Sequence, residues 1–170
     1  MTKIRYIEAP TVKMPAEYYS LDAKTVFLAG GITGCSDWQK VMTDKILVDS
    51  EDIIVFNPRR AKLDVSDKSQ SKIQVQWEFD FLKYANCISF WFTNEAIQPI
   101  ALFELGVWSA MRFGPANESR KKIFIGIQPG YARDFDIRFQ MQLSNPTVAL
   151  EICDNLDELA NKVIEHYARR

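Results

Sequence analysis

The amino-acid sequence predicts a single doubly wound α/β domain built on a parallel sheet. Short apolar runs typical of buried strands alternate with longer segments of helical periodicity. The clearest run, Cys87–Phe92, is apolar on both faces, as expected for a central parallel strand. A chain of 170 residues is long enough for one well-cored domain and short for two. We therefore expect a sheet of about five strands, flanked by helices and joined by right-handed crossovers.

The expected elements follow one another in a regular order. Residues 1–24 show no clean period and are expected to form an irregular N-terminal arm before the α/β domain over residues 25–170. Residues 131–143 are too polar for a core element and too patterned for a linker. The predicted strands are Thr25–Ala29, Ile53–Phe56, Cys87–Phe92, Lys122–Ile127 and Val148–Ile152. The predicted helices run from Ser36 to about Ser50, from Ser71 to Ala85, from Pro99 to about Phe113, and from Asn155 to Tyr167.

Composition excludes several classes of protein. Hydrophobic residues make up 47% of the chain and charged residues 25%, as in ordinary globular proteins. A formal net charge of −1 gives no indication of nucleic acid or an anionic membrane as partner. No apolar run approaches the roughly 20 residues that span a bilayer, and no secretory signal is present. Three cysteines without CxxC spacing are typical of reduced thiols, so we expect a cytoplasmic protein.

The chain contains one histidine, His166, near the end of the last predicted helix. A histidine-rich metal site is therefore excluded, and we expect neither a metal ion nor a cofactor. A serine or cysteine nucleophile activated by histidine would depend on this one residue.

A glycine-rich turn follows the first predicted strand, with candidate ligand contacts at Gly30, Gly31 and Gly34. Glycines allow close backbone approach, and the helix start that follows offers unpaired N–H groups to an anion. The spacing differs from the GxGxxG fingerprint, and no Gly-Lys-Ser/Thr of a P-loop is present. Two interpretations stay open: a tight strand–helix turn, or a loop that holds the sugar or 5′-phosphate end of a nucleotide-like ligand.

Polar residues also follow the second and third predicted strands. Asn57, Arg59 and Arg60 come after the second strand, and Gln98 ends the loop after the third. Open α/β sheets bind ligands at the carboxyl ends of their strands, where guanidinium groups hold phosphate or carboxylate. The alternative is that these arginines are solvated loop residues.

Glu104 is the main catalytic candidate. It lies in the opening turns of a predicted helix that begins with Pro99 in the first-turn position. Helical spacing places it on one stripe with apolar side chains, namely Ile100, Val107, Trp108 and Met111. Burying an ionised carboxylate without partners is costly. The position therefore indicates either a functional carboxylate or a glutamate tipped to the solvated edge of a core helix.

Glu78 is the candidate partner of Glu104. It lies on the preceding helix, beside a predicted core stripe of Ile73, Trp77, Phe81 and Tyr84. Two carboxylates converging on one cleft are the minimum set for glycosyl chemistry, in which one attacks the anomeric carbon and the other shuttles a proton. Proximity and partial burial would raise one pKa and leave the other group ionised. Periodicity does not prove that they meet, and Asp80 is the alternative second carboxylate.

Several segments together resemble the nucleoside 2-deoxyribosyltransferase family, in its branch of short bacterial and phage-type members. They are Val26–Gly31, Asn57–Arg60, Trp77-Glu78 and Pro99–Gly106, within a resemblance over roughly residues 25–145. The resemblance implies a flavodoxin-like fold and transfer of 2-deoxyribose between nucleobases through a covalent deoxyribosyl-enzyme. Glu104 matches the nucleophile, and Glu78 falls where the family places an acidic residue that handles the proton of the base.

The resemblance also implies roles for other positions. Phe27 stands where family members often carry a tyrosine near the nucleophile, so other groups must orient Glu104. The region around Arg133, Asp136 and Gln140 resembles a segment that often completes a neighbouring subunit's site, which implies a homo-oligomer.

We expect an enzyme that acts on nucleosides or nucleotides and free nucleobases. The first alternative is a nucleoside or nucleotide N-glycosidase with the same residues, because water and an acceptor base compete for the same intermediate. In related hydrolases of the superfamily the substrate is a nucleotide, whose 5′-phosphate Arg59 or Arg60 could contact. The second alternative is a non-catalytic sensor that binds a nucleotide-like ligand.

Overall fold

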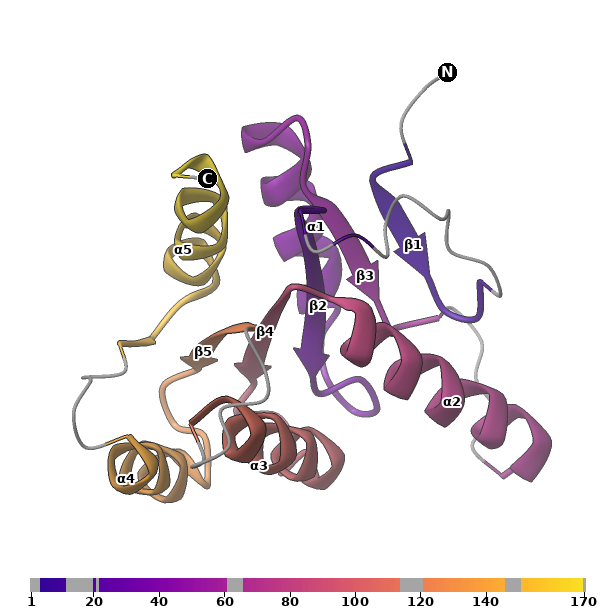
Figure 1. The fold of residues 1–170 in the computed structure, drawn as a ribbon. Coiled ribbons are helices and arrows are strands. Elements are labelled where there is room, and N and C mark those ends of the chain that lie inside the picture. Colours follow the sequence, from indigo (N-terminus) through magenta and orange to yellow (C-terminus); the bar gives the residue numbers. More distant parts are fainter. Residues whose placement is uncertain are drawn as a thin grey trace.

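The computed structural model describes residues 4–11, 20, 22–60, 66–113, 121–145 and 151–169. Within them, six parallel strands form one sheet in the order β1-β3-β2-β4-β5-β6, with helices on both faces (Figure 1). The strands are β1 Tyr6–Glu8, β2 Thr25–Gly30, β3 Ile54–Asn57, β4 Cys87–Phe92, β5 Lys122–Ile127 and β6 Ile152–Cys153. The helices are α1 Trp38–Asp49, α2 Lys68–Tyr84, α3 Pro99–Phe113, α4 Asp134–Ser144 and α5 Leu156–Ala168. The predicted doubly wound, flavodoxin-like α/β fold is confirmed.

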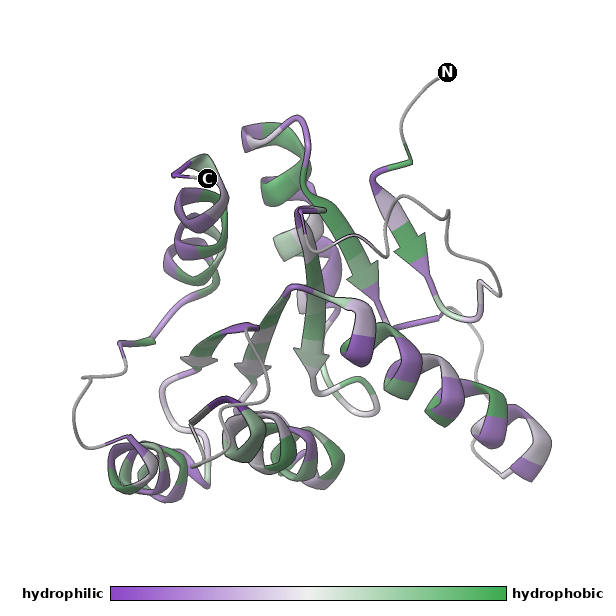
Figure 2. Ribbon diagram, viewed as in Figure 1, coloured by the Kyte–Doolittle hydropathy of each residue, from purple (hydrophilic) through white to green (hydrophobic). Residues whose placement is uncertain are grey.

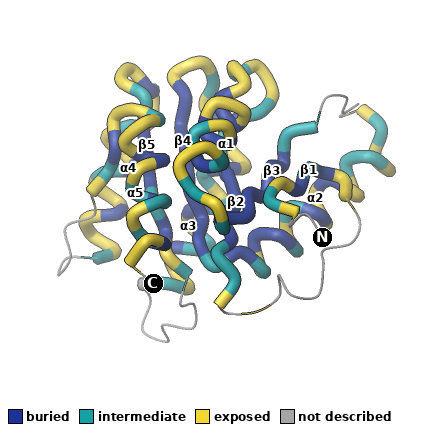
Figure 3. The backbone as a smooth tube through the Cα atoms, turned by 90° about the horizontal axis from the view of Figure 1, so that it is seen from above, coloured by how far each residue is buried: buried dark blue, intermediate teal, exposed yellow. Residues whose placement is uncertain are grey.

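The middle of the sheet is buried on both faces. Strand β4 pairs with β2 on one side and β5 on the other, and all six of its residues are buried (Figure 3). A central parallel strand has no solvent-facing side, which explains why its sequence shows no polar alternation. The hydropathy colouring shows the same apolar centre (Figure 2).

Alternate side chains of each strand enter two different cores. Phe27 and Phe56 lie in one core with residues of α2, α3 and α4, whereas Val26 and Val55 lie in the other with residues of α1 and α5. This alternation follows from the two-residue period of a strand. Helices α2, α3 and α4 therefore share one face of the sheet, and α1 and α5 share the other (Figure 1).

Residues expected in an irregular arm contribute an edge strand. β1 pairs in parallel with β3, with Tyr6 opposite Val55 and Glu8 opposite Asn57. A run of three residues is too short to show a period, so the sequence gives no strand signal there. The rest of the arm, residues 1–3, 12–19 and 21, lies outside the described residues.

Two segments late in the chain also depart from expectation. The polar segment around residues 131–143 is helix α4, which buries only Ile137 and Met141. The predicted strand Val148–Ile152 falls mostly on residues 146–150, outside the described residues, and β6 is formed by Ile152–Cys153.

The predicted core stripes of two helices are only partly correct. In α2, Trp77 and Phe81 are buried as predicted and Tyr84 packs against the core. In α2 the buried residues include Gln74, whereas Ile73 is 52% exposed. In α3 the buried residues include Ala101, Leu105 and Ser109, whereas Ile100 is 65% exposed. The larger apolar side chains of Ile100 and Phe103 face outward. None of the helices in the described part of the chain has both the length and the apolar character to cross a membrane.

Candidate active site

Helices α2 and α3 bring Glu78 and Glu104 together. The two helices precede and follow β4 and lie on the same face of the sheet, where Trp77 and Leu105 share one core. Burial, together with a smaller contribution from repulsion by Glu78, raises the pKa of Glu104 to about 8. The two carboxylates therefore lie within range of an electrostatic interaction.

The two glutamates have different partners. Glu78 Oε1 accepts a hydrogen bond of 2.9 Å from Gln74 Nε2. Burial raises the pKa of Glu78, while the Gln74 hydrogen bond and the positive charge of Arg60 oppose that rise. Among the described residues no side chain donates a hydrogen bond to the Glu104 carboxyl group. The pair is therefore asymmetric: burial raises both pKa values, but described groups that favour the ionised form act on Glu78 and not on Glu104.

Asp80 lies on the same helix but has a different partner. Its Oδ1 accepts a hydrogen bond of 3.1 Å from the exposed Gln76, one helical turn earlier. The charge of Glu78 helps to raise the pKa of Glu104, whereas Asp80 is not among the groups that shift the pKa of Glu104. The geometry thus favours Glu78 over Asp80 as the second carboxylate of a pair.

Phe27 lies in the core beside this pair. It is fully buried in β2, and its ring centroid is 6.0 Å from that of Trp77 on α2. The side chain fills space and offers no hydroxyl group. This absence is consistent with the lack of a described donor to Glu104.

The glycine turn is fixed by contacts with its neighbours. The Gly31 N–H donates to Gln98 Oε1 at 2.7 Å, and the Gly31 carbonyl accepts from Trp38 Nε1 at 2.9 Å. A Cβ atom at Gly31 would lie 2.5 Å from Cys35 Sγ and 2.7 Å from Gln98 Cδ. Only glycine therefore fits, and Gln98 connects the turn to the start of α3. Gly30 is similarly confined by the Trp91 carbonyl, whereas Gly34 has open space around it.

Arg59 stabilises the same turn from the outside. Its guanidinium group donates to the Ser36 carbonyl at 2.8 Å and to Gln39 Oε1 at 2.9 Å, and forms an ion pair of 3.3 Å with Asp37. Asp37 also caps α1 by accepting from the Lys40 N–H. The start of α1 is thus already neutralised by an aspartate of the chain itself.

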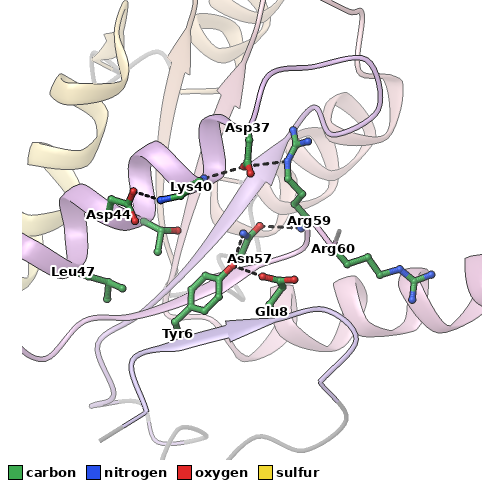
Figure 4. A pocket seen from close by; sticks show the side chains of 10 residues that line it. Tyr6, Glu8, Asp37, Lys40, Asp44, Leu47, Asn57, Arg59 and Arg60 are labelled. Atoms are coloured by element: carbon green, nitrogen blue, oxygen red, sulfur yellow. Dashed lines mark hydrogen bonds and ion pairs between the residues drawn. The ribbon is translucent and has the colours of Figure 1, made fainter. Parts of the chain in front are cut away.

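Asn57, Arg59 and Arg60 also line a surface cavity of about 590 Å³ (Figure 4). Its other lining residues come from β1 and α1, namely Tyr6, Glu8, Asp37, Lys40, Thr43, Asp44 and Leu47. Asn57 donates to the Tyr6 hydroxyl, which donates to Glu8, so much of the polar lining is internally paired. Tyr6 and Glu8 alternate along β1 with Ile7, which lies in the core of α2 and α3. Most of the cavity lining is therefore on the α1 side of the sheet, whereas Arg60 also acts on Glu78 on the other side.

A comparison with protein families assigns the chain. A family model described as "Nucleoside 2-deoxyribosyltransferase like" matches residues 23–115, more than half of the 170 residues. The chain belongs to the nucleoside 2-deoxyribosyltransferase-like family. The matched segment of this family member runs from the start of β2 past the end of α3 and so contains both glutamates, the glycine turn and Asn57–Arg60. A search of curated proteins gave no match.

Three predicted site residues of this family member lie outside the matched segment, on or next to α4. Arg133 and Asp136 form an exposed ion pair of 3.5 Å, and Gln140 is exposed. Among the described contacts none joins them to Glu78 or Glu104 of the same chain.

Gln74 is a site neighbour that does not belong to the predicted core stripe of α2. It is 5% exposed and donates a hydrogen bond to Glu78. One signal was available, because glutamine and a carboxylate four residues apart on a helix are neighbours.

Proposed function

We propose that this protein cleaves the N-glycosidic bond of a (deoxy)nucleoside and transfers the sugar to a second nucleobase. The observation that carries the proposal is the pair of partly buried, electrostatically coupled carboxylates on α2 and α3, within the segment that matches the family. Glu104 acts as the nucleophile, and Glu78 exchanges a proton with the base.

The proposed reaction balances without a cofactor. A Glu104 carboxylate oxygen attacks C1′ of the sugar, the bond from C1′ to the base nitrogen breaks, and the base leaves with a proton from Glu78. A second base then attacks C1′ and gives its proton to Glu78, while the ester bond breaks and restores the Glu104 carboxylate. Each half-reaction needs one proton shared between the two glutamates.

The electrostatics of the free protein suit a pair that holds one proton. The pKa of Glu104 is raised to about 8, so at neutral pH it is mostly protonated, whereas the Gln74 hydrogen bond and the charge of Arg60 oppose the rise in the pKa of Glu78. Attack on C1′ needs the reverse arrangement. We therefore expect the proton to pass from Glu104 to Glu78 when a nucleoside occupies the site.

The decisive experiment incubates the protein with deoxynucleosides, with and without a second free base, and follows the products by chromatography. Product that forms only with added base supports transfer. Free sugar formed without a base supports the N-glycosidase. Binding without turnover supports a sensor, and normal turnover by Glu104→Gln contradicts the mechanism.

The same assay tests the remaining substrate contacts. Gly30, Gly31, Gly34, Asn57, Arg60 and Gln98 stay predicted substrate-binding residues, as do Phe27, Asp80 and Arg59. Comparing a deoxynucleoside with its 5′-monophosphate, in the wild type and in Arg60→Gln, shows whether a phosphate is recognised. A phosphate-specific rise in KM for Arg60→Gln supports that contact, and an equal KM for both substrates contradicts it.

We also propose that the active form is a homo-oligomer. Phe103 on α3 is 70% exposed, and Phe135 on α4 is 75% exposed with its ring stacked on Phe139. Exposed apolar patches of this kind mark interaction surfaces, and α4 carries Asp136 and Gln140, with Arg133 at its N-cap. Light scattering should show more than one copy per particle, and Phe103→Ser should shift the protein toward monomer. A monomeric wild type with full activity would contradict this proposal.

A further inference from the structure

Gln74 is a buried amide whose orientation is fixed by chemistry. Its Nε2 lies 2.8 Å from the Pro58 carbonyl oxygen and 2.9 Å from Glu78 Oε1. A proline carbonyl can only accept hydrogen bonds, so the NH₂ group of Gln74 must face it. The same NH₂ group then donates to Glu78, and a donated hydrogen bond favours the ionised form of a carboxylate.

Gln74 costs stability in this position. The side chain is 5% exposed, and its Oε1 atom is buried without a hydrogen-bond partner in the described part of the chain. A buried polar atom without a partner is unfavourable, and an apolar side chain of the same length would avoid the cost. A use for the amide at Glu78 would explain this cost.

We propose that Gln74 is a positioning residue that keeps Glu78 ionised in the free protein and thereby places the shared proton of the carboxylate pair on Glu104. The inference rests on the proposed function only in treating the pair as catalytic. Because the NH₂ group is anchored to Pro58 at the end of β3, Gln74 holds Glu78 in a fixed place as well as in a fixed protonation state.

The other charged groups that act on Glu78 come from two neighbouring elements. Arg60, in the loop after β3, supports the ionised form, and Glu104, on α3, opposes it. On α2 itself, Asp80 is paired with Gln76. Gln74 is the group that donates a described side-chain hydrogen bond to Glu78, so its removal should change the Glu78 titration more than removal of any uncharged neighbour on α2.

Gln76 is a matched control for Gln74. Both glutamines lie on α2 and donate to a carboxylate four residues later, but Gln76 is exposed and its partner is Asp80. Gln74→Met and Gln76→Met are therefore the same change in the same type of pair, one at the proposed site and one away from it. Gln74→Asn is a second variant, polar but one methylene too short to bridge Pro58 and Glu78.

A titration tests the inference without any turnover. In Glu104→Gln protein with ¹³C-labelled glutamate, NMR reports the titration of the Glu78 carboxyl group without coupling to its neighbour. Adding Gln74→Met or Gln74→Asn should raise the Glu78 midpoint by about one pH unit, because a hydrogen bond to the ionised form is lost. Adding Gln76→Met should leave the midpoint unchanged. An unchanged midpoint in both folded Gln74 variants overturns the inference.

The pH dependence of turnover provides the functional readout. Because the reaction requires one proton on the pair of glutamates, the plot of kcat/KM against pH should be bell-shaped. Its acid limb should report the protonation of Glu78, which removes the negative charge of that side chain. Gln74→Met should move the acid limb up by about one pH unit and leave the alkaline limb in place. A fall in activity without a shift of the acid limb would indicate a structural role and overturn the inference. If the wild type has no turnover, the proposed function fails, while the NMR titration still decides the role of Gln74.

Discussion

The two faces of the sheet are built differently. On one face, α1 and α5 contact each other and bury side chains such as Ile46 and Leu159 completely. On the other face, α2, α3 and α4 leave large apolar side chains exposed, including Phe103 and Phe135, and partly bury two carboxylates. On the first face, the carboxylates of α1 and α5 are all exposed, and the large apolar side chains left exposed are two valines, Val41 and Val48. The second face departs further from the rule of apolar inside and polar outside.

This difference supports the proposal that the face with α2, α3 and α4 carries the function. Partly buried carboxylates and exposed aromatic side chains both lower the stability of an isolated chain, so their concentration on one face indicates a use there. On the α1/α5 face, the helices pack against each other as well as against the sheet. Four predictions test this difference.

The largest expected effect is on activity, at the α2/α3 face. Glu104→Gln removes the proposed nucleophile and should lower kcat/KM for base exchange by several orders of magnitude. Glu165→Gln, on the exposed side of α5, should leave it unchanged. Chromatographic assays of both purified variants check the expectation, and comparable activities would remove the functional distinction between the faces.

The second effect is on stability, at the α1/α5 face. Leu159→Ala should lower the free energy of unfolding by about 2 to 5 kcal/mol, because it opens a cavity at a fully buried position. The same substitution at the exposed Leu143 of α4 should change it by less than about 0.5 kcal/mol in dilute protein. Urea denaturation measures both, and equal losses would show that the faces contribute alike.

The third effect is a pH-dependent change of stability. Folding raises the pKa of Glu104 to about 8, so the folded state holds a proton that the unfolded chain releases near its ordinary value of 4.5. Wild-type stability should therefore fall as pH rises through this window, whereas Glu104→Gln has no carboxyl group there to titrate. At pH 9 the variant should be more stable by about 2 to 4 kcal/mol, with little difference near pH 4. Thermal melts across pH check this, and a constant difference would contradict the burial of Glu104.

The smallest effect concerns the edge strand on the α1 side. Tyr6→Phe removes the hydroxyl that accepts from Asn57 and donates to Glu8. The loss should lower the free energy of unfolding by about 1 kcal/mol, as for one typical hydrogen bond. Activity at the opposite face should not change. Loss of exchange activity in this variant would place the cavity in the reaction.

The sequence by itself determined the elements and the class of fold. Three strands with strong apolar runs, β2, β4 and β5, lie within one residue of their predicted ends, because a strand buried on both faces needs an uninterrupted apolar run. Pro99 begins α3 as predicted, since proline suits a helix start. The family was also predicted correctly, because its motifs are local segments that sequence displays directly.

Only the tertiary structure decided which side chains meet. Glu78 and Asp80 differ by two positions, about 200° around a helix, and the packing of α2 set Glu78 toward Glu104. The same packing buried the polar Gln74 and exposed the apolar Ile73, which is the reverse of what their hydrophobicity predicts. The physical reason is that all the contacts between a helix and the sheet together fix the rotation of the helix about its axis. If the helix turned by the angle of one residue, a side chain in the core would move to the site, and a side chain in the site would move away from it.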